Sequence, residues 1–143
     1  MEFDLNDQTY VADKIPAMKQ FHIIRRLAPV LAGLVPSGEV GQLQGMMSGK
    51  AEDIVPRLAD ALSKVSDDDS EFVLYGLLAA VKRKEKQGMG YSPLVVGGKL
   101  MYQNLTLPEM LQIAARSAQL NFKDFLSALP QTLNSADQKQ SAQ

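Results

Sequence analysis

The longest apolar run of the chain, FVLYGLLAAV from Phe72 to Val81, constrains the fold more than any other segment. Acids precede this run and bases follow it: Asp67, Asp68, Asp69 and Glu71 on one side, and Lys82, Arg83, Lys84 and Lys86 on the other. A helix dipole favours this order of charges, so the pattern predicts a helix that begins at the acids and ends at the bases. Because its middle is apolar on all sides, we expect the other elements to pack around it. The run is about half as long as a bilayer-spanning helix, so no membrane span is predicted.

A second helix is predicted in KQFHIIRRLAPVLAGL, starting near Pro16 and running to about Gly33. Two neighbouring strips at helical spacing are apolar: Phe21, Ile24, Ala28 and Leu31, and beside them Ile23, Leu27, Val30 and Leu34. The opposite side, which we interpret as a solvated face, carries Lys19, His22, Arg26 and Pro29, with Arg25 at its edge. Pro29 removes one backbone donor, so a bend is expected there that wraps the apolar strips around a core.

Two short hairpins are predicted from turn residues that are flanked by alternating side chains. A loop at Asn6-Asp7 would place Phe3 opposite Tyr10 and Asp4 opposite Thr9. A loop at Gly97-Gly98 would pair Val96 with Lys99, Val95 with Leu100 and Leu94 with Met101. Both faces of this second ribbon carry apolar groups, and an isolated ribbon is marginally stable in water. We therefore expect it to lie on helices, to join the first hairpin in a sheet, or to meet another subunit.

Three more helices complete the predicted bundle. One runs from Ala51 to about Val65, the next begins at a capping box of Thr106 and Glu109 and is interrupted near Asn121, and a short one ends at Pro130. The predicted fold class is mainly α: a single domain over residues 1–130, built as a helical bundle of about five helices with one or two short β-hairpins. Residues 131–143, QTLNSADQKQSAQ, are expected to form a disordered polar tail.

The chain offers few side chains for catalysis or metal binding. It has no cysteine, and its single histidine, His22, lies beside basic side chains that oppose a bound cation. No G-x-S-x-G segment presents a serine, and Asp67–Asp69 lacks the spacing of a calcium loop. Ser48-Gly49-Lys50 matches the end of a phosphate loop, but Gln44 and Ala51 replace residues that the motif requires. We therefore predict no catalytic, cofactor-binding or metal-binding residues and no enzyme. A catalytic pair of carboxylates brought together by the fold stays open, because no sequence pattern selects or excludes one.

The charge pattern gives weak support to nucleic-acid binding. The basic segment Lys82–Lys86 could gather with Lys19, Arg25 and Arg26 into one patch. A net charge of -1 and an aromatic content of 6% argue against this function, and a dipole-matched helix end explains the same residues. The start, MEFDLNDQTY, lacks the basic and apolar regions of a signal peptide, so export is not expected, and the absence of cysteine fits a reducing cytosol.

The order of the segments is the most specific feature of the chain. A short hairpin is followed by KQFHIIRRLAPVLAGL, then an acid cluster leads into FVLYGLLAAVKRK, and GMGYSPLVVGGKLMYQN precedes LPEMLQIAARSAQLNFKDFLSALP. In this order and spacing, from about Tyr10 to Pro130, the chain resembles the tail assembly chaperones of long-tailed bacteriophages and prophages.

This resemblance implies a cytoplasmic, non-enzymatic assembly factor without cofactors. Its partners would be the long tape measure protein, which it binds, and the tail tube protein, whose subunits it helps to recruit before the tube polymerises. Such families often include a longer form made by ribosomal frameshifting, and this chain would correspond to the short form or to a member without extension. No catalytic or ligand-binding residue transfers from the family.

Apolar residues in predicted loops indicate where a partner would bind. We expect partner contacts in the segments Gly41–Lys50 and Gly88–Tyr102, at Met46, Met47, Met89, Tyr91, Leu94, Val96 and Met101. Methionine side chains are flexible and suit a repetitive helical partner, although they would also fill the chain's own core. Two other functions stay open, a small nucleic-acid-binding or regulatory module and a structural component of the virion, as does self-association into a homo-oligomer.

Overall fold

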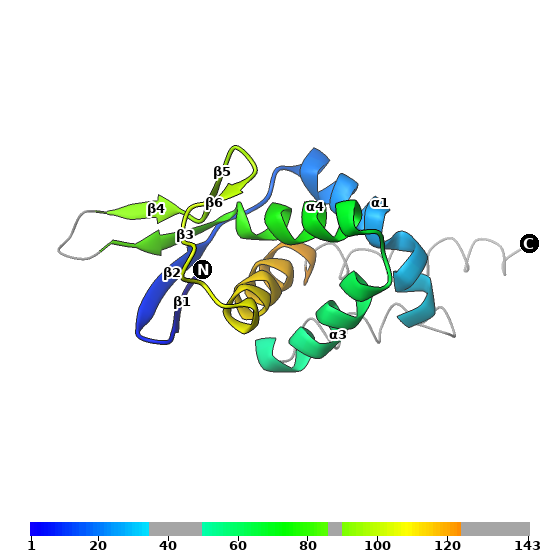
Figure 1. Ribbon diagram of the computed structural model, residues 1–143, viewed down its shortest axis with the longest axis horizontal. Helices are drawn as coiled ribbons and strands as arrows, with labels where there is room; N and C mark the ends of the chain where they lie inside the picture. Colours follow the sequence, from blue (N-terminus) through cyan, green and yellow to red (C-terminus); the bar gives the residue numbers. More distant parts are fainter. Residues whose placement is uncertain (35–49, 86–89, 124–143) are drawn as a thin grey trace, which may run out of the picture.

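The computed structural model describes residues 1–34, 50–85 and 90–123, which form both helices and strands (Figure 1). The elements are β1 (Glu2–Leu5), β2 (Gln8–Ala12), α1 (Ala17–Leu34), α3 (Ala51–Ser63), α4 (Asp67–Leu78), β3 (Val81–Lys84), β4 (Tyr91–Pro93), β5 (Val95–Val96) and β6 (Lys99–Leu100). A further helix covers residues 107–123. The predicted polar tail, residues 131–143, lies outside the described residues.

The first predicted hairpin is confirmed, and its register is the predicted one. β1 and β2 pair antiparallel with Phe3 opposite Tyr10 and Asp4 opposite Thr9. Asn6 and Asp7 have φ angles of 50° and 65°, the left-handed values that a two-residue type I′ loop requires. The alternation of the strand sends Tyr10 and Ala12 into the core, where both are fully buried.

The second predicted hairpin is also confirmed. β5 and β6 pair Val95 with Leu100 and Val96 with Lys99, as the Gly97-Gly98 turn predicts. The Met101 N–H donates to the Leu94 carbonyl over 2.7 Å, which extends the pairing by one more step. This ribbon is a separate two-stranded sheet, and the N–H of Leu94 attaches it to β3 by a 3.1 Å bond to the Val81 carbonyl.

The prediction of a mainly α bundle of about five helices is wrong. The described residues form a mixed α/β fold with four helices and six strands in two antiparallel sheets. The larger sheet has the order β1-β2-β3-β4, and its third strand is the basic run that was expected to end a helix. The carboxyl end of α4 therefore carries no basic residue in its last turn.

Strand pairing explains why the basic run leaves the helix. β2 offers its free edge to residues 81–84, so Tyr10 pairs with Arg83 and Ala12 with Val81. Strand alternation then buries Val81 completely and leaves Lys82 and Lys84 in solvent. Basic residues at the end of a helix would stabilise that helix by only tenths of a kcal/mol. Burial of Val81 in the core and the backbone pairing of β3 with β2 stabilise the strand by more than this.

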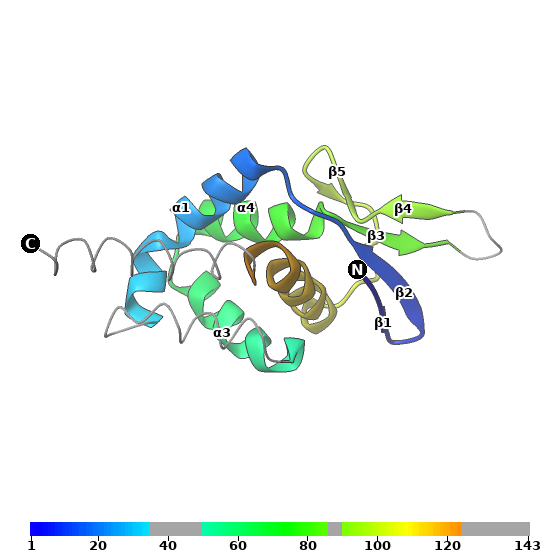
Figure 2. The same cartoon turned by 180° about the vertical axis from the view of Figure 1, so that it is seen from behind.

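α4 is the central helix, as predicted. Ser66 caps its amino end by accepting a 3.1 Å hydrogen bond from the Asp69 N–H, and its first turn holds Asp67, Asp68 and Asp69. Val73, Leu77 and Leu78 are buried among the other elements. In both views α4 lies between α1 and helix 107–123, which is yellow to orange (Figure 1, Figure 2).

α1 follows its predicted bounds, but its apolar face is narrower than expected. Ile23 and Leu27 are buried, whereas Phe21, expected on the core side, is 54% exposed. Met18, one helical turn before Phe21, is 65% exposed. The buried part of the helix is thus centred on Ile23 and Leu27, with Ile24 half-buried against the core. Among the described residues no helix is long and apolar enough to cross a membrane.

Helix 107–123 begins as predicted and continues where an interruption was expected. The N–H and hydroxyl of Thr106 donate to Oε1 of Glu109 over 3.1 and 2.8 Å, and the Glu109 N–H returns a 3.3 Å bond to the hydroxyl. The helix runs through Asn121, whose side chain is buried and fully used in hydrogen bonds. The predicted break at Asn121 is therefore wrong, because tertiary partners satisfy the polar side chain inside the helix.

Candidate interaction surface

The predicted partner residues fall into three groups in the structure. Tyr91, Val96 and Met101 are exposed by 43%, 51% and 56%, so their apolar surfaces are available to a partner. Leu94, which lies between them in sequence, is completely buried. Met46, Met47 and Met89 lie outside the described residues.

Leu94 is a core residue of the folded chain and has no surface to offer. Its N–H and carbonyl tie the β5–β6 ribbon to Val81 and Met101, and its side chain belongs to the main hydrophobic cluster. A charged replacement at Leu94 would place an unpaired charge in the core and unfold the domain. The prediction that Leu94 contacts a partner is therefore corrected, and Tyr91, Val96 and Met101 are exposed apolar residues of this segment.

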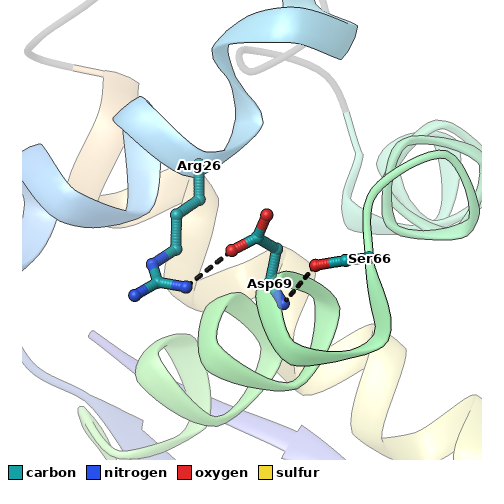
Figure 3. Close-up of polar contacts among 3 residues, drawn as sticks. All are labelled: Arg26, Ser66 and Asp69. Atoms are coloured by element: carbon teal, nitrogen blue, oxygen red, sulfur yellow. Dashed lines mark hydrogen bonds and ion pairs between the residues drawn. The ribbon is translucent and has the colours of Figure 1, made fainter.

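The predicted solvated face of α1 is exposed at Arg25 and Pro29, but Arg26 and Lys19 of this face contact α4. Nη1 of Arg26 lies 2.6 Å from Oδ1 of Asp69 (Figure 3). The backbone N–H of the same aspartate donates to the hydroxyl of Ser66, which caps α4. The guanidinium of Arg26 also lies over the ring of Phe72, 4.0 Å from its centroid. The ion pair is about one-third exposed, so its electrostatic contribution is modest, but its geometry fixes the two helices against each other.

Lys19 extends this contact along the two helices. Its ammonium lies 4.4 Å from the centroid of the Phe72 ring, on the same ring that Arg26 covers. Gly76 makes the close approach possible, since a Cβ there would lie 3.1 Å from Cδ1 of Ile23 and 3.3 Å from Cε of Lys19. His22, in contrast, packs beside Phe21 with ring centroids 5.5 Å apart and is half-buried.

An open groove runs along the outer side of α4, and we call it the α4 groove. Its first part, with a volume of about 320 Å³, is lined by Asp68, Glu71, Phe72, Tyr75 and Val95. Its second part, of about 370 Å³, is lined by Asp13, Lys14, Pro16, Ala80 and Lys82. Lys19, Gly76 and Ala79 line both parts, so the two hollows adjoin each other.

The α4 groove was not predicted from the sequence, because α4 was expected to be covered on all sides. Glu71, Tyr75 and Ala79 follow one another at helical spacing, and Gly76 and Ala80 add small side chains beside them. The small side chains at Gly76, Ala79 and Ala80, which follow the large Tyr75, are the signal that could have indicated a hollow at the carboxyl end of α4. It is hidden inside an apolar run that also suits a fully buried helix.

A second polar cluster fixes the ribbon to the larger sheet. The hydroxyl of Tyr102 donates to the carboxylate of Glu85, and the guanidinium of Arg83 lies 4.6 Å from the centroid of the Tyr102 ring. Burial, followed by the bond to Glu85, raises the pKa of Tyr102, while the hydrogen bond from Tyr102 lowers the pKa of Glu85. Both groups therefore keep their usual charge at neutral pH, which fits a structural contact.

The described residues show little sign of a catalytic or metal centre. They contain no group of three or more histidine, cysteine, aspartate or glutamate side chains placed to hold a metal ion. The basic residues that could have formed one patch are spread over different contacts: Arg26 binds Asp69, Arg83 donates to Gln8 over 3.1 Å, and Lys82 lies 3.9 Å from Asp13. A single basic surface for nucleic acid is therefore not formed by these side chains.

Comparison with known proteins identifies one family. The family model described as phage tail assembly chaperone protein, TAC, matches residues 6–134, which is most of the chain and includes every described helix. Neither the curated proteins nor the solved structures include a significant match.

Proposed function

The chain belongs to the family of phage tail assembly chaperone proteins, and from this premise we propose that it binds the tape measure protein and helps to recruit tail tube subunits. The family match over residues 6–134 is the observation that carries the proposal. The proposed role is non-enzymatic and takes place in the cytoplasm of the bacterial host, where the tail is assembled.

The physical need for such a chaperone supports the proposal. A long helical protein with apolar stripes aggregates unless a temporary partner covers those stripes until the tube encloses them. The described surface offers apolar groups for this purpose at Tyr91, Val96 and Met101. We propose that these residues, together with Met46, Met47 and Met89, contribute to the surface that holds the tape measure protein.

Co-expression with the tape measure protein tests the proposal. We expect the tape measure protein to be soluble and to co-purify with this chain, and to aggregate when the chain is omitted. A well-expressed tape measure protein whose solubility does not depend on this chain would overturn the proposed function. If the chain remained in purified phage particles, a structural virion component would be the better description.

Paired substitutions test the proposed surface. Val96→Glu and Met101→Glu place charges at exposed positions, so we expect the domain to stay folded while capture of the tape measure protein falls about tenfold. Leu107→Glu is the matched control, because Leu107 is 61% exposed at the start of helix 107–123, away from the ribbon. Equal capture by all three variants would remove Val96 and Met101 from the binding surface.

A further inference from the structure

We infer that the α4 groove is a docking site for one amphipathic helix of a partner, with basic residues at one end of its apolar stripe and acidic residues at the other. The inference rests on the proposed function, because it places this helix in the tape measure protein. It adds where the helix lies, which way its charges run, and which side chains of this chain meet it.

The dimensions of the groove suit a short helical segment. Its lining follows α4 from Asp68 to Ala79, which is roughly 16 Å at 1.5 Å per residue. A partner helix of about three turns covers this length. Its ligand is therefore an extended apolar stripe, because the groove is open along its length rather than closed around a small molecule.

Between its charged ends the lining of the groove is mostly apolar, with Lys19 as the exception. Phe72, Tyr75 and Val95 provide side chains on the walls, and Gly76 and Ala79 form a floor without bulk. Gly76 brings α1 close, so the aliphatic part of Lys19 lies over Gly76, where the two parts of the groove adjoin. Helix-in-groove recognition uses this arrangement, in which large apolar side chains of the guest lie over small residues of the host.

The charges at the two ends of the groove define the occupant. Asp68 and Glu71 lie at the end over the start of α4, and both are exposed. Lys14 and Lys82 lie at the other end, where Asp13, the single acid, lies 3.9 Å from Lys82, while Lys19 lines both parts. The acidic end is complementary to basic side chains of the guest, and the end with excess lysine is complementary to acidic ones.

Filling the floor of the groove tests the docking site. Ala79 is exposed and has ordinary helical angles, so Ala79→Trp adds bulk to the groove without strain in the core. With co-expressed tape measure protein as the probe, we expect capture by Ala79→Trp to fall at least tenfold. Ala28→Trp is the control, because Ala28 is an exposed helical alanine on α1 that does not line the groove.

Reversing one charge tests the proposed orientation. Asp68→Lys removes an acid from the groove, and Asp67→Lys removes an acid from the same helical turn that does not line it. Both variants lose the same interaction with the helix dipole, so their stabilities should match. We expect Asp68→Lys to weaken capture several-fold, more strongly at low salt, and Asp67→Lys to bind as the unmodified chain does.

The outcomes separate this inference from the proposed function. If the unmodified chain fails to capture the tape measure protein, the proposed function fails and takes the inference with it. If the unmodified chain captures it and Ala79→Trp does so equally well, the function stands and the groove is not the docking site. If Ala79→Trp turns a dimer into a monomer in sedimentation, the occupant is a second copy of this chain, which also overturns the inference.

Discussion

Asn121 joins segments that are far apart in the sequence. Its Oδ1 accepts a 2.6 Å bond from the buried N–H of Ile15 and a 3.2 Å bond from Nε2 of Gln20. Its Nδ2 donates to the carbonyls of Asp13 and Ser117 over 3.2 and 2.9 Å. The connection between β2 and α1 is thus anchored on helix 107–123 by one side chain, at the place where the sequence pattern suggested a helix break.

Replacing this anchor should cost stability. Asn121→Ala leaves the buried Ile15 N–H without its acceptor, and an unsatisfied buried donor costs about 1–3 kcal/mol, so we expect the free energy of unfolding in urea to fall by roughly 2 kcal/mol. Ser117→Ala is the control on the same helix, because the buried Ser117 hydroxyl has no hydrogen-bond partner among the described residues. It should leave stability unchanged or raise it, and an equal loss in both variants would contradict the role of the hydrogen bonds.

At the scale of the element, the capping box of helix 107–123 links helix stability to pH. Hydrogen bonds from the backbone and then the side chain of Thr106 hold the pKa of Glu109 below its ordinary value of 4.5. A carboxyl whose pKa is lower in the folded than in the unfolded chain stabilises the fold above its unfolded pKa. This contribution is lost as the pH falls through the folded pKa.

Glu109→Gln tests this linkage, because glutamine keeps an acceptor oxygen but cannot ionise. The carboxylate is near solvent, so we expect the unmodified chain to be more stable than the variant by less than about 1 kcal/mol at pH 7. The difference should shrink as the pH falls through the folded pKa and vanish once the carboxyl is protonated in both states. A series of thermal unfolding measurements from neutral to acid pH tests this, and a difference that stays constant over the series would show that the charge is not its cause.

Elements with local signals were predictable, and those that depend on distant partners were not. Asn6-Asp7 and Gly97-Gly98 fix their hairpins within a few residues, and the capping box at Thr106 marks its own helix, so all three follow from the sequence. β3 becomes a strand only because β2 offers its edge. Lys19 and Arg26 on the polar side of α1 lie over the ring of Phe72 in α4, and no spacing within α1 predicts this contact.

The partner surface was predictable in part for the same reason. Exposed apolar residues next to a recognisable turn, such as Val96 and Met101, follow from local register. Register alone did not tell the buried Leu94 from the exposed Met101 opposite it, because that difference comes from packing against the rest of the core. The α4 groove likewise forms only where α1, α4 and the ribbon meet.

At the scale of the whole molecule, one hydrophobic cluster joins the sheets to the helices. The cluster draws residues that are at most 1% exposed from both sheet strands and helices: Tyr10 of β2, Val81 of β3, Ile23 of α1, Leu77 of α4 and Ile113 of helix 107–123. Neither the strands nor the helices have a separate core among the described residues. Unfolding of the strands therefore exposes apolar side chains of the helices, and unfolding of the helices exposes those of the strands.

We therefore expect the described part of the chain to unfold as one cooperative unit. Three of the four tyrosines lie in or beside the sheets, so near-ultraviolet circular dichroism reports mainly on the strands, while the far-ultraviolet signal reports on the helices. Both signals should change at the same urea concentration. Val81→Ala, which removes about 2 kcal/mol of core packing from a strand, should shift both midpoints together, because the helices share the cavity that it leaves. A helical signal that kept its midpoint in this variant would show that the helices have a stability of their own.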